Sequence, residues 1–169
     1  TQDIASVDEE GFVYFHGRRH ELISRNGRVI VPRILDEILE EVPGIHRVVS
    51  FWHGQDIPHG KLGVCIMLES DVEVSLVDVK KAISDSPMND WIEMPELWIL
   101  CEFIPHGLLS ATKEAPIRHG VASTLGLSHG LDGVLILRQI KQERTYFNFE
   151  SVVLDDNQTI RFVEGRILL

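Results

Sequence analysis

The chain has 169 residues, of which 44% are hydrophobic and 25% charged, an ordinary composition for a soluble globular protein of one domain or one domain with an appendage. Its formal net charge of −10 argues against nucleic-acid binding, because contact with phosphates requires a basic surface. No apolar run approaches the roughly 20 residues of a membrane helix, and the N-terminus lacks a signal-type segment, so we predict a cytoplasmic protein without a membrane span.

The first elements predicted along the chain are short strands around a tight turn. Residues 12–15, 21–25 and 28–31 have the β-branched and aromatic content of strands. The dipeptide Asn26-Gly27 lies between the last two strands and favours the type I′ turn of a β-hairpin. Around this turn the sequence is basic, with five arginines and one acid in residues 18–33. The segment would suit a phosphate-rich small molecule, or simply form the solvated face of a hairpin.

A helix is predicted from Pro32, because proline suits the first helical turn and apolar residues then recur at helical spacing. The acidic residues between them are interpreted as solvated charges on the outer face, rather than as metal ligands or acid–base groups. Pro43-Gly44 ends the helix. The apolar positions are Ile34, Leu35, Ile38, Leu39 and Val42, and the outward acids are Asp36, Glu37, Glu40 and Glu41.

The remaining pattern predicts an α+β fold, with a small sheet, a hairpin and two helices packed on one face of the sheet. From about residue 120 the sequence becomes rich in Ser, Thr, Gly and His, and strand patterns follow it. We therefore divide the chain into residues 1–119 and a linker with a β-rich extension, 120–169, which has no predicted role. The strands are predicted at 45–52, 62–68, 97–103, 134–140, 145–154 and 159–163, and the second helix at 74–84.

The cysteine and histidine residues give no sign of a metal site. Cys65 and Cys101 lie in separate apolar runs without a CxxC spacing, so we expect buried, unpaired thiols. The histidines outside the first hairpin have no metal-ligand spacing and are expected at the surface. These histidines are His46, His53, His59, His106, His119 and His129.

A recognisable motif spans the basic segment: glycine, arginine, two variable residues, an acidic residue, a glycine turn, and a proline that opens a helix. It is supplied by Gly17, Arg18, Glu21, Gly27 and Pro32. The span resembles the start of the mobile C-terminal subdomain of the adenylate-forming superfamily, which includes acyl-CoA synthetases, adenylation domains and luciferase. The resemblance covers residues 1–119 and is nearest in motif to long-chain acyl-CoA synthetases and carboxylic acid reductases.

The resemblance implies roles for residues near the N-terminus. Thr1-Gln2-Asp3 resembles the family motif Thr-Gly-Asp, so Asp3 is expected to bind the ribose hydroxyls of ATP. Arg18 is expected to reach the ribose or the phosphates. His20 falls at the family's hinge position, where backbone torsions change between the adenylating and thiol-transferring conformations. A plain strand residue is the alternative for His20.

Near the end of the resemblance, Gly107 to Lys113 is similar to the family sequence that precedes its catalytic lysine. Lys113 is the candidate, because a cation lowers the repulsion between a carboxylate and the α-phosphate of ATP. In the relatives the lysine falls one residue later, where this chain has Glu114. The basic residue that follows the family lysine by three positions is here Arg118, five positions beyond Lys113.

On the thiol side, the resemblance implies that Gly27, Arg28 and Arg25 line the passage for CoA or a carrier phosphopantetheine, with a plain Asn-Gly turn as the alternative. The implied function is the C-terminal part of an acid–thiol ligase that makes acyl-AMP from a carboxylic acid and ATP. Such a part is expected to be inactive without an N-terminal adenylation domain, which holds most contacts to ATP and Mg²⁺. The alternative is a non-catalytic, partner-binding or regulatory module derived from that subdomain.

Overall fold

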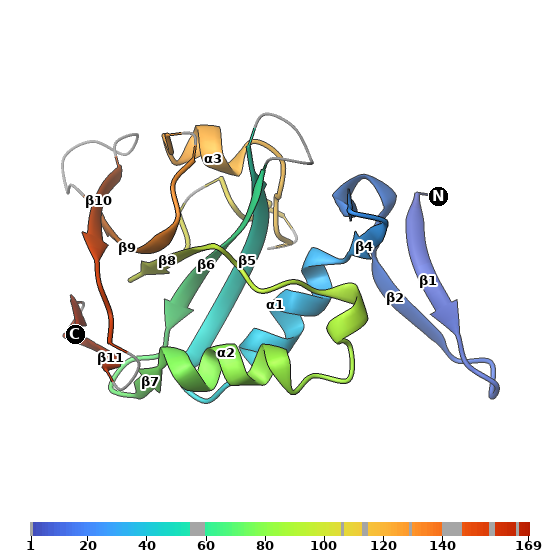
Figure 1. Ribbon diagram of the computed structural model, residues 1–169, viewed down its shortest axis with the longest axis horizontal. Coiled ribbons are helices and arrows are strands. Elements are labelled where there is room, and N and C mark those ends of the chain that lie inside the picture. Colours follow the sequence, from blue (N-terminus) through green and yellow to red (C-terminus); the bar gives the residue numbers. More distant parts are fainter. Residues whose placement is uncertain are drawn as a thin grey trace.

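The computed structural model describes residues 2–54, 60–105, 107–112, 115–128, 130–139, 147–155, 158–164 and 166–169. At its centre is a five-stranded mixed sheet in the order β10-β9-β8-β6-β5 (Figure 1). β8 pairs in parallel with both β6 and β9, whereas β5 and β10 are antiparallel to their neighbours. The strands are β5 (Ile45–His53), β6 (Lys61–Leu68), β8 (Leu97–Cys101), β9 (Gly133–Gln139) and β10 (Phe147–Val152).

Helices and loops cover both faces of this sheet. α1 (Pro32–Glu40) and α2 (Leu76–Ser84) pack on one face, and the short α3 (Val121–Thr124) packs on the other (Figure 1). Because successive side chains of a strand point to opposite faces, β8 divides its residues between two cores. Trp98 and Leu100 join the core of α1 and α2, whereas Leu97, Ile99 and Cys101 join that of α3. The predicted α+β class is confirmed.

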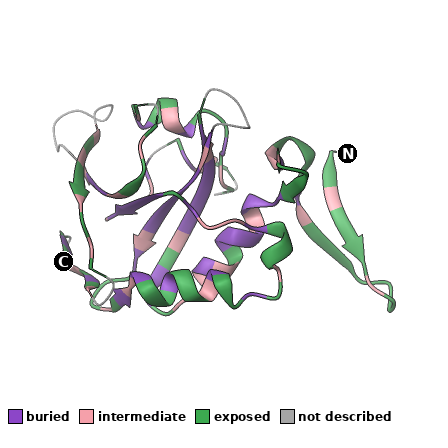
Figure 2. Ribbon diagram, viewed as in Figure 1, coloured by how far each residue is buried: buried purple, intermediate pink, exposed green. Residues whose placement is uncertain are grey.

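Two hairpins precede α1. The first, β1 (Asp3–Val7) with β2 (Val13–Arg18), stands at one end of the molecule and is mostly exposed (Figure 2). A 3-10 turn, η1 (Arg19–Glu21), leads from it to the second, β3 (Ile23–Arg25) with β4 (Arg28–Ile30). Asn26 and Gly27 have φ of 51° and 74°, and the type I′ turn requires positive φ at both central residues. The predicted turn is therefore confirmed.

The end of α1 depends on a glycine. Gly44 has φ of 89°, a left-handed conformation, and a Cβ at this position would lie 2.5 Å from Cγ2 of Val74. Both the backbone and the packing therefore exclude a side chain. The chain can reverse here and enter β5 only because Gly44 has none.

The region after residue 120 is built into the same structure. β9 pairs with β8 in the central sheet, and β11 (Thr159–Val163) lies between β7 (Glu73–Ser75) and β12 (Arg166–Leu168) in a second, three-stranded sheet. The predicted β-rich extension is present, but the boundary at 119–120 stays a prediction, since the central sheet continues across it. No described helix has the length and apolar character needed to cross a membrane.

Burial confirms one prediction about the isolated polar residues and contradicts another. Cys65 and Cys101 are buried, unpaired thiols, as expected, and burial raises the pKa of both. His53 is only 2% exposed, so its expected surface position is wrong. It stands in the last position of β5, a strand in which Val48, Val49, Ser50 and Phe51 are buried as well. His46 and His119 are exposed, as predicted.

Candidate functional site

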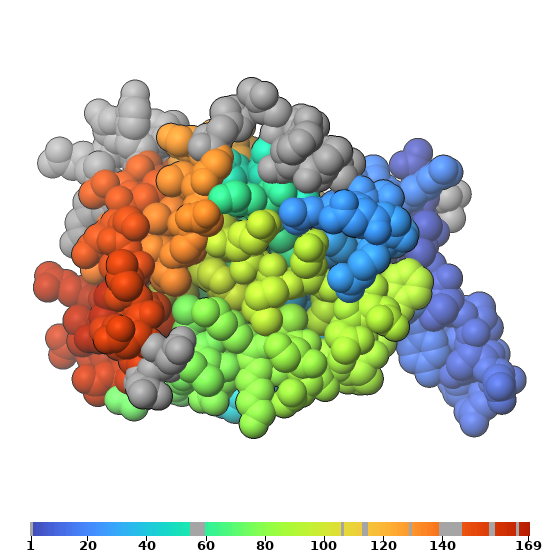
Figure 3. All heavy atoms as spheres, viewed as in Figure 1, coloured from blue at the N-terminus to red at the C-terminus, as the bar shows by residue number. Residues whose placement is uncertain are grey.

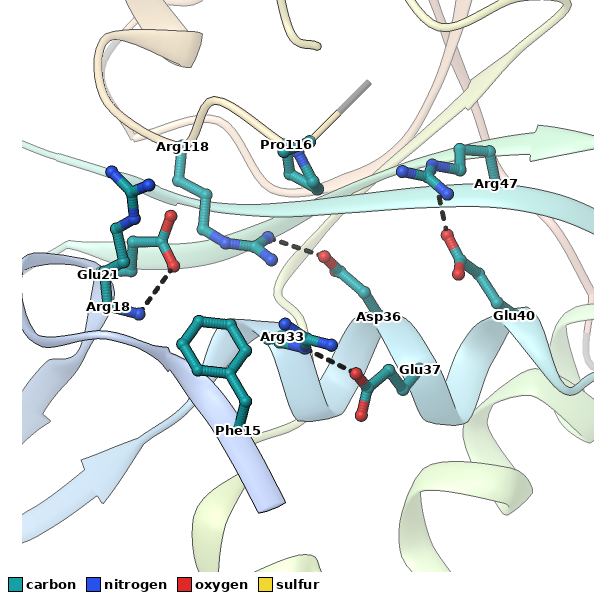
Figure 4. Close-up of a pocket in the computed structure, with 11 residues that line it drawn as sticks. Phe15, Arg18, Glu21, Arg33, Asp36, Glu37, Glu40, Arg47, Pro116 and Arg118 are labelled. Carbon is teal, nitrogen blue, oxygen red and sulfur yellow. Dashed lines mark hydrogen bonds and ion pairs between the residues drawn. The ribbon is translucent and has the colours of Figure 1, made fainter. Parts of the chain in front are cut away.

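A cleft of about 330 Å³ lies between β2, α1 and residues 115–118 (Figure 4). Arg18 and Glu21 enter it from the first hairpin and η1, Asp36 from α1, and Arg118 from the segment that follows the predicted lysine motif. Residues from three distant parts of the chain therefore meet here. Among them is Arg18, which the sequence motif assigned to nucleotide binding.

A buried ion pair forms the floor of this cleft. Arg118 Nη1 lies 2.7 Å from Asp36 Oδ2, and both side chains are less than a tenth exposed. Each partner also bonds to the backbone of Ser50 in β5: the Ser50 N–H donates to Asp36 Oδ1 over 2.8 Å, and the Ser50 carbonyl accepts from Arg118 Nη1 over 2.8 Å. Three chain segments are thereby fixed to one another.

The position of Asp36 corrects a prediction. We expected an outward, solvated carboxylate, but Asp36 is 5% exposed and faces β5. Burial raises its pKa to about 6, and the neighbouring Arg118 acts in the opposite direction. Glu40, one turn later, is half-buried and accepts a hydrogen bond from the N–H of Val48. Two of the four acids expected to face outward therefore bind the adjacent strand.

Asp3 and Arg18 are brought together by strand register. They face each other as partners in the β1–β2 hairpin, with 4.0 Å between Arg18 Nε and Asp3 Oδ1. Both side chains are about half exposed, Arg18 at 58% and Asp3 at 47%, so they remain accessible to a ligand. Glu21 Oε2 accepts the backbone N–H of Arg18 and caps the turn that follows. The acidic position of the motif thus stabilises the backbone around Arg18.

Arg33 and Phe15 also line the cleft, and the sequence motif did not single them out. The guanidinium of Arg33 lies over the Phe15 ring, 4.6 Å from its centroid, and its Nε donates to Glu37 over 2.6 Å. The Arg33–Glu37 spacing of four residues is the sequence signal for the ion pair. No sequence pattern indicated the contact with Phe15, which lies on the preceding hairpin.

His20, the predicted hinge residue, stacks on His119. Their ring centroids are 5.2 Å apart and the rings are inclined by 24°. His119 directly follows Arg118, so this contact is a second link between the N-terminal part of the described chain and residues 115–119. The hinge role of His20 stays a prediction.

The predicted thiol-side arginines make intramolecular contacts. Arg25 Nη1 lies 3.5 Å from Glu93 and 3.6 Å from Glu96, and its guanidinium stands over the ring of Trp52. These contacts place Arg25 against the segment that precedes β8. The side chain is therefore only 17% exposed.

Arg28 makes a second link to the same segment. Its Nη2 donates to the carbonyls of Asn89 and Ile92, at the two ends of the 3-10 turn η2 (Asn89–Trp91). A methyl group added at Gly27 would meet no described atom within 4 Å, so the turn itself is open. The arginines thus brace the hairpin, and their contact with a thiol donor stays a prediction.

The lysine motif is only partly described. Lys113 and Glu114 lie outside the described residues, as do Thr1, His59, His106 and His129. On either side of Lys113 the backbone pairs: Ser110 N–H donates to Ala115 O over 2.8 Å, and Ile117 N–H to Leu108 O over 2.7 Å. In the family motif the basic residue follows the lysine by three positions. The residue three positions before Arg118 is Ala115, not a lysine.

The described residues contain no group of three or more His, Cys, Asp or Glu side chains arranged to hold a metal ion. Ion pairing instead engages the charged groups of the cleft. Arg118 pairs with Asp36, Arg33 with Glu37, and Arg47 with Glu40. The pair of Arg18 with Asp3, at 4.0 Å, is longer than these three, which leaves Arg18 the most open of the four arginines to an anion.

Comparison with known proteins gives sequence matches over a short span and many matches in fold. No protein-family profile matches the chain. Over 56 residues it is 38% identical to 2-succinylbenzoate–CoA ligase from Staphylococcus aureus. The match covers 33% of this chain and 11% of that enzyme, so the chain matches only about a tenth of the relative's length.

This chain covers about a quarter of the length of each of three similar solved structures. Mycobacterium tuberculosis fatty acyl-CoA synthetase gives a TM-score of 0.55 at 20% identity, covering 73% of this chain and 24% of its own. Klebsiella oxytoca NpsA, in complex with 3-hydroxyanthranilyl-AMSN, gives a TM-score of 0.57 at 18% identity. The match covers 74% of this chain and 23% of NpsA. An ATP-bound RpMatB–BxBclM chimera gives 0.54 at 17% identity, with 72% and 23% covered. The predicted resemblance to adenylate-forming enzymes is confirmed at the level of the fold.

Proposed function

We propose, from a fold shared with acyl-CoA ligases, that this chain is the mobile C-terminal subdomain of an ATP-dependent acid–thiol ligase. In such an enzyme a carboxylate attacks the α-phosphate of ATP, giving acyl-AMP and pyrophosphate, and a CoA or carrier thiol then displaces AMP. The observation that carries the proposal is the Asp36–Arg118 pair, which holds the segment after Lys113 at the cleft that contains Arg18.

The residues at the edge of this cleft suit a nucleotide. The Asp3 carboxylate can accept hydrogen bonds from two ribose hydroxyls, and the Arg18 guanidinium can donate to phosphate oxygens. Their accessibility and their pairing across β1 and β2 support this assignment. Lys113 supplies the cation that lowers the repulsion between carboxylate and phosphate. Mg²⁺ is assigned mainly to the N-terminal adenylation domain.

The subdomain alone is expected to be inactive, because the acyl pocket and the loop for the ATP phosphates belong to an N-terminal domain. The test is ATP–pyrophosphate exchange with a panel of carboxylic acids, using this chain, its N-terminal domain, and the two mixed. We expect exchange only in the mixture, and the responsive acid identifies the substrate. Silence with every acid, from folded proteins, would contradict the proposal.

One observation favours a second function, a non-catalytic module that binds or regulates a partner. If Arg118 is the basic residue of the family motif, the lysine position is Ala115, and the activating cation is missing. This function predicts that adding the chain to an active N-terminal domain leaves exchange at its basal rate while the two proteins still associate. Sedimentation of the mixture separates this outcome from a simple failure to bind.

The thiol-side assignment gives a separate prediction. In the complete enzyme, replacing Arg25 and Arg28 by Ser should weaken use of the thiol donor, seen as a raised KM for CoA or carrier, while ATP–pyrophosphate exchange stays unchanged. The physical reason is the loss of two cations near the donor phosphates. Arg161→Ser, at an exposed position of β11, is the matched control. Equal losses in exchange and thiol transfer would contradict the thiol-side role. They would indicate that both arginines only brace the hairpin, through their contacts with Glu93 and Asn89.

A further inference from the structure

The first hairpin, β1 with β2, carries large apolar side chains that the described part of the chain leaves uncovered. Four of them, in its outer half, are between 51% and 69% exposed. Two of the four are direct partners in the strand register and form one apolar pair. Figure 3 shows the hairpin projecting from the body at one end of the molecule. These four residues, the hairpin patch, are Val7, Phe12, Val13 and Tyr14, with Val7 opposite Val13.

A hairpin of two strands is at best marginally stable in water unless another element covers its apolar side. Within the described residues β1 and β2 pair only with each other. The body covers their inner half, where Gly17 is buried and Phe15 lies beneath the guanidinium of Arg33. From Val7 to Tyr14 the described hairpin has no buried residue. Apolar side chains gathered on one projecting element indicate a surface for another protein segment.

The turn at the tip of the hairpin is ordered by one carboxylate. Asp8 Oδ1 accepts the N–H of Glu10 over 3.0 Å and the N–H of Phe12 over 2.9 Å. Asp8 Oδ2 accepts the hydroxyl of Tyr14 over 2.8 Å, which fixes a member of the patch. The patch is therefore largely in place before a partner arrives, and this lowers the entropic cost of binding.

Charge narrows the kind of partner. The turn carries three consecutive acids beside the patch, Asp8, Glu9 and Glu10, and the chain as a whole has a formal charge of −10. A second copy of the chain brings another acidic turn and the same net charge, so self-association is opposed by repulsion. The surface that fits is apolar at its centre and bordered by Lys or Arg side chains.

The solved structures that share this fold are about four times as long as this chain, so in them the fold is one part of a larger protein. We propose that the hairpin patch docks on the N-terminal adenylation domain of the same enzyme, with the acidic turn against basic side chains of that domain. This docking surface rests on the proposed function, which supplies the domain. It adds the contact through which the two parts meet.

The test compares amide hydrogen exchange in the complete enzyme and in the 169-residue chain, without substrates. We expect the amides of residues 5–15 to exchange at least about tenfold more slowly in the complete enzyme, because docking suppresses local opening. β10, at the opposite end of the molecule (Figure 1), is the internal reference and should differ little. Equal exchange of the hairpin in both proteins would overturn the proposal. Protection in the chain alone that rises with its concentration would assign the patch to a second copy and also overturn it.

One substitution at two exposed valines locates the surface. Val13→Lys in the complete enzyme places a charge in the apolar contact and should return the hairpin to the exchange rate of the chain alone. Val153→Lys, at a valine that is 93% exposed, is the matched control and should keep the protection. In the 169-residue chain Val13→Lys should exchange as the parent does, which separates loss of docking from unfolding of the hairpin. Full protection in the Val13→Lys enzyme would overturn the proposal.

The acidic turn gives a second readout. Glu9→Lys combined with Glu10→Lys should lower the protection of the hairpin in the complete enzyme. Glu69→Lys combined with Glu164→Lys, at exposed positions elsewhere, changes the net charge equally and should not. Equal effects of the two pairs would contradict the basic border of the partner surface.

Failure of the docking and failure of the ligase function give different results. Amide exchange is measured without turnover, so silence in ATP–pyrophosphate exchange counts against the ligase function alone. An active enzyme whose hairpin exchanges as in the isolated chain counts against the docking alone.

Discussion

In the complete enzyme, Lys113→Ala should depress adenylate formation by about 10²- to 10³-fold or more. The side chain is proposed to lie between the attacking carboxylate and the α-phosphate, two anions whose repulsion dominates the barrier once they are brought together. Thioester formation from preformed acyl-AMP should be spared, because the phosphoryl chemistry is then complete. ATP–pyrophosphate exchange measures the first step, and release of AMP from added acyl-AMP and thiol measures the second.

Lys80→Ala, at an exposed position of α2, is the control for loss of a lysine and should leave both steps unchanged. Ala115→Lys restores a lysine three residues before Arg118, the family spacing, and tests the displaced motif directly. If Lys113→Ala leaves exchange at the parent rate, Lys113 has no part in the mechanism. A large rise in the rate of ATP–pyrophosphate exchange on Ala115→Lys in the same enzyme would instead support the non-catalytic module.

Arg118→Met should lower the free energy of unfolding of this chain by about 3–5 kcal/mol. Methionine keeps most of the volume, so the loss comes from leaving the Asp36 carboxyl buried without its countercharge, 5% exposed beneath the cleft. The double variant Asp36→Leu, Arg118→Met should cost less than Arg118→Met alone, since it buries no unpaired charge. Urea denaturation followed by circular dichroism gives both values.

The same variant has a predicted pH dependence. The folded pKa of Asp36, about 6, lies above the ordinary aspartate value of 3.8, so its contribution to stability is complete below pH 3.8 and is lost as the pH rises through about 6. Arg118 lowers this pKa. Without Arg118 the folded pKa of Asp36 is higher still, so the loss of stability with rising pH continues to higher pH. Arg118→Met should therefore be more destabilising at about pH 8 than at about pH 5.

Arg33→Met is the comparison for these measurements. It breaks an exposed pair with Glu37 at helical spacing, which should cost less than about 1 kcal/mol at either pH. Similar losses for Arg33→Met and Arg118→Met, or a loss for Arg118→Met that is the same at both pH values, would contradict the role given to the buried pair.

Local signals predicted most of the fold. Pro32 and the apolar spacing after it marked the start and the buried side of α1, and Asn26-Gly27 marked the turn whose torsions the structure confirms. Local signals did not predict which residues cover the second face of the central sheet, the face on which α3 packs. Leu108, Val121 and their neighbours form that core in a region of weak periodicity, where burial comes from contacts with strands distant in sequence.

The site was predictable only where a motif pointed to it. Asp3 and Arg18 were singled out from the sequence, and strand register places them opposite each other, while their role in nucleotide binding stays a prediction. Asp36 was placed on the wrong side of its helix because charge alone argues for solvent. Its partners, Ser50 and Arg118, lie 14 and 82 positions away in the sequence, and no local pattern connects them. Arg25 and Arg28 likewise show their bracing contacts only once the chain is folded.

The buried pair has a further consequence at the edge of the central sheet. β5 is an outer strand, and the outward N–H groups of Val48 and Ser50 are bonded to Glu40 and Asp36, while the Ser50 carbonyl is bonded to Arg118. An outer strand with these groups open is a template for a strand of another molecule. The side chains that build the floor of the cleft therefore also keep copies of the protein from joining sheet to sheet, and a chain that loses them is exposed to aggregation before it is fully unfolded.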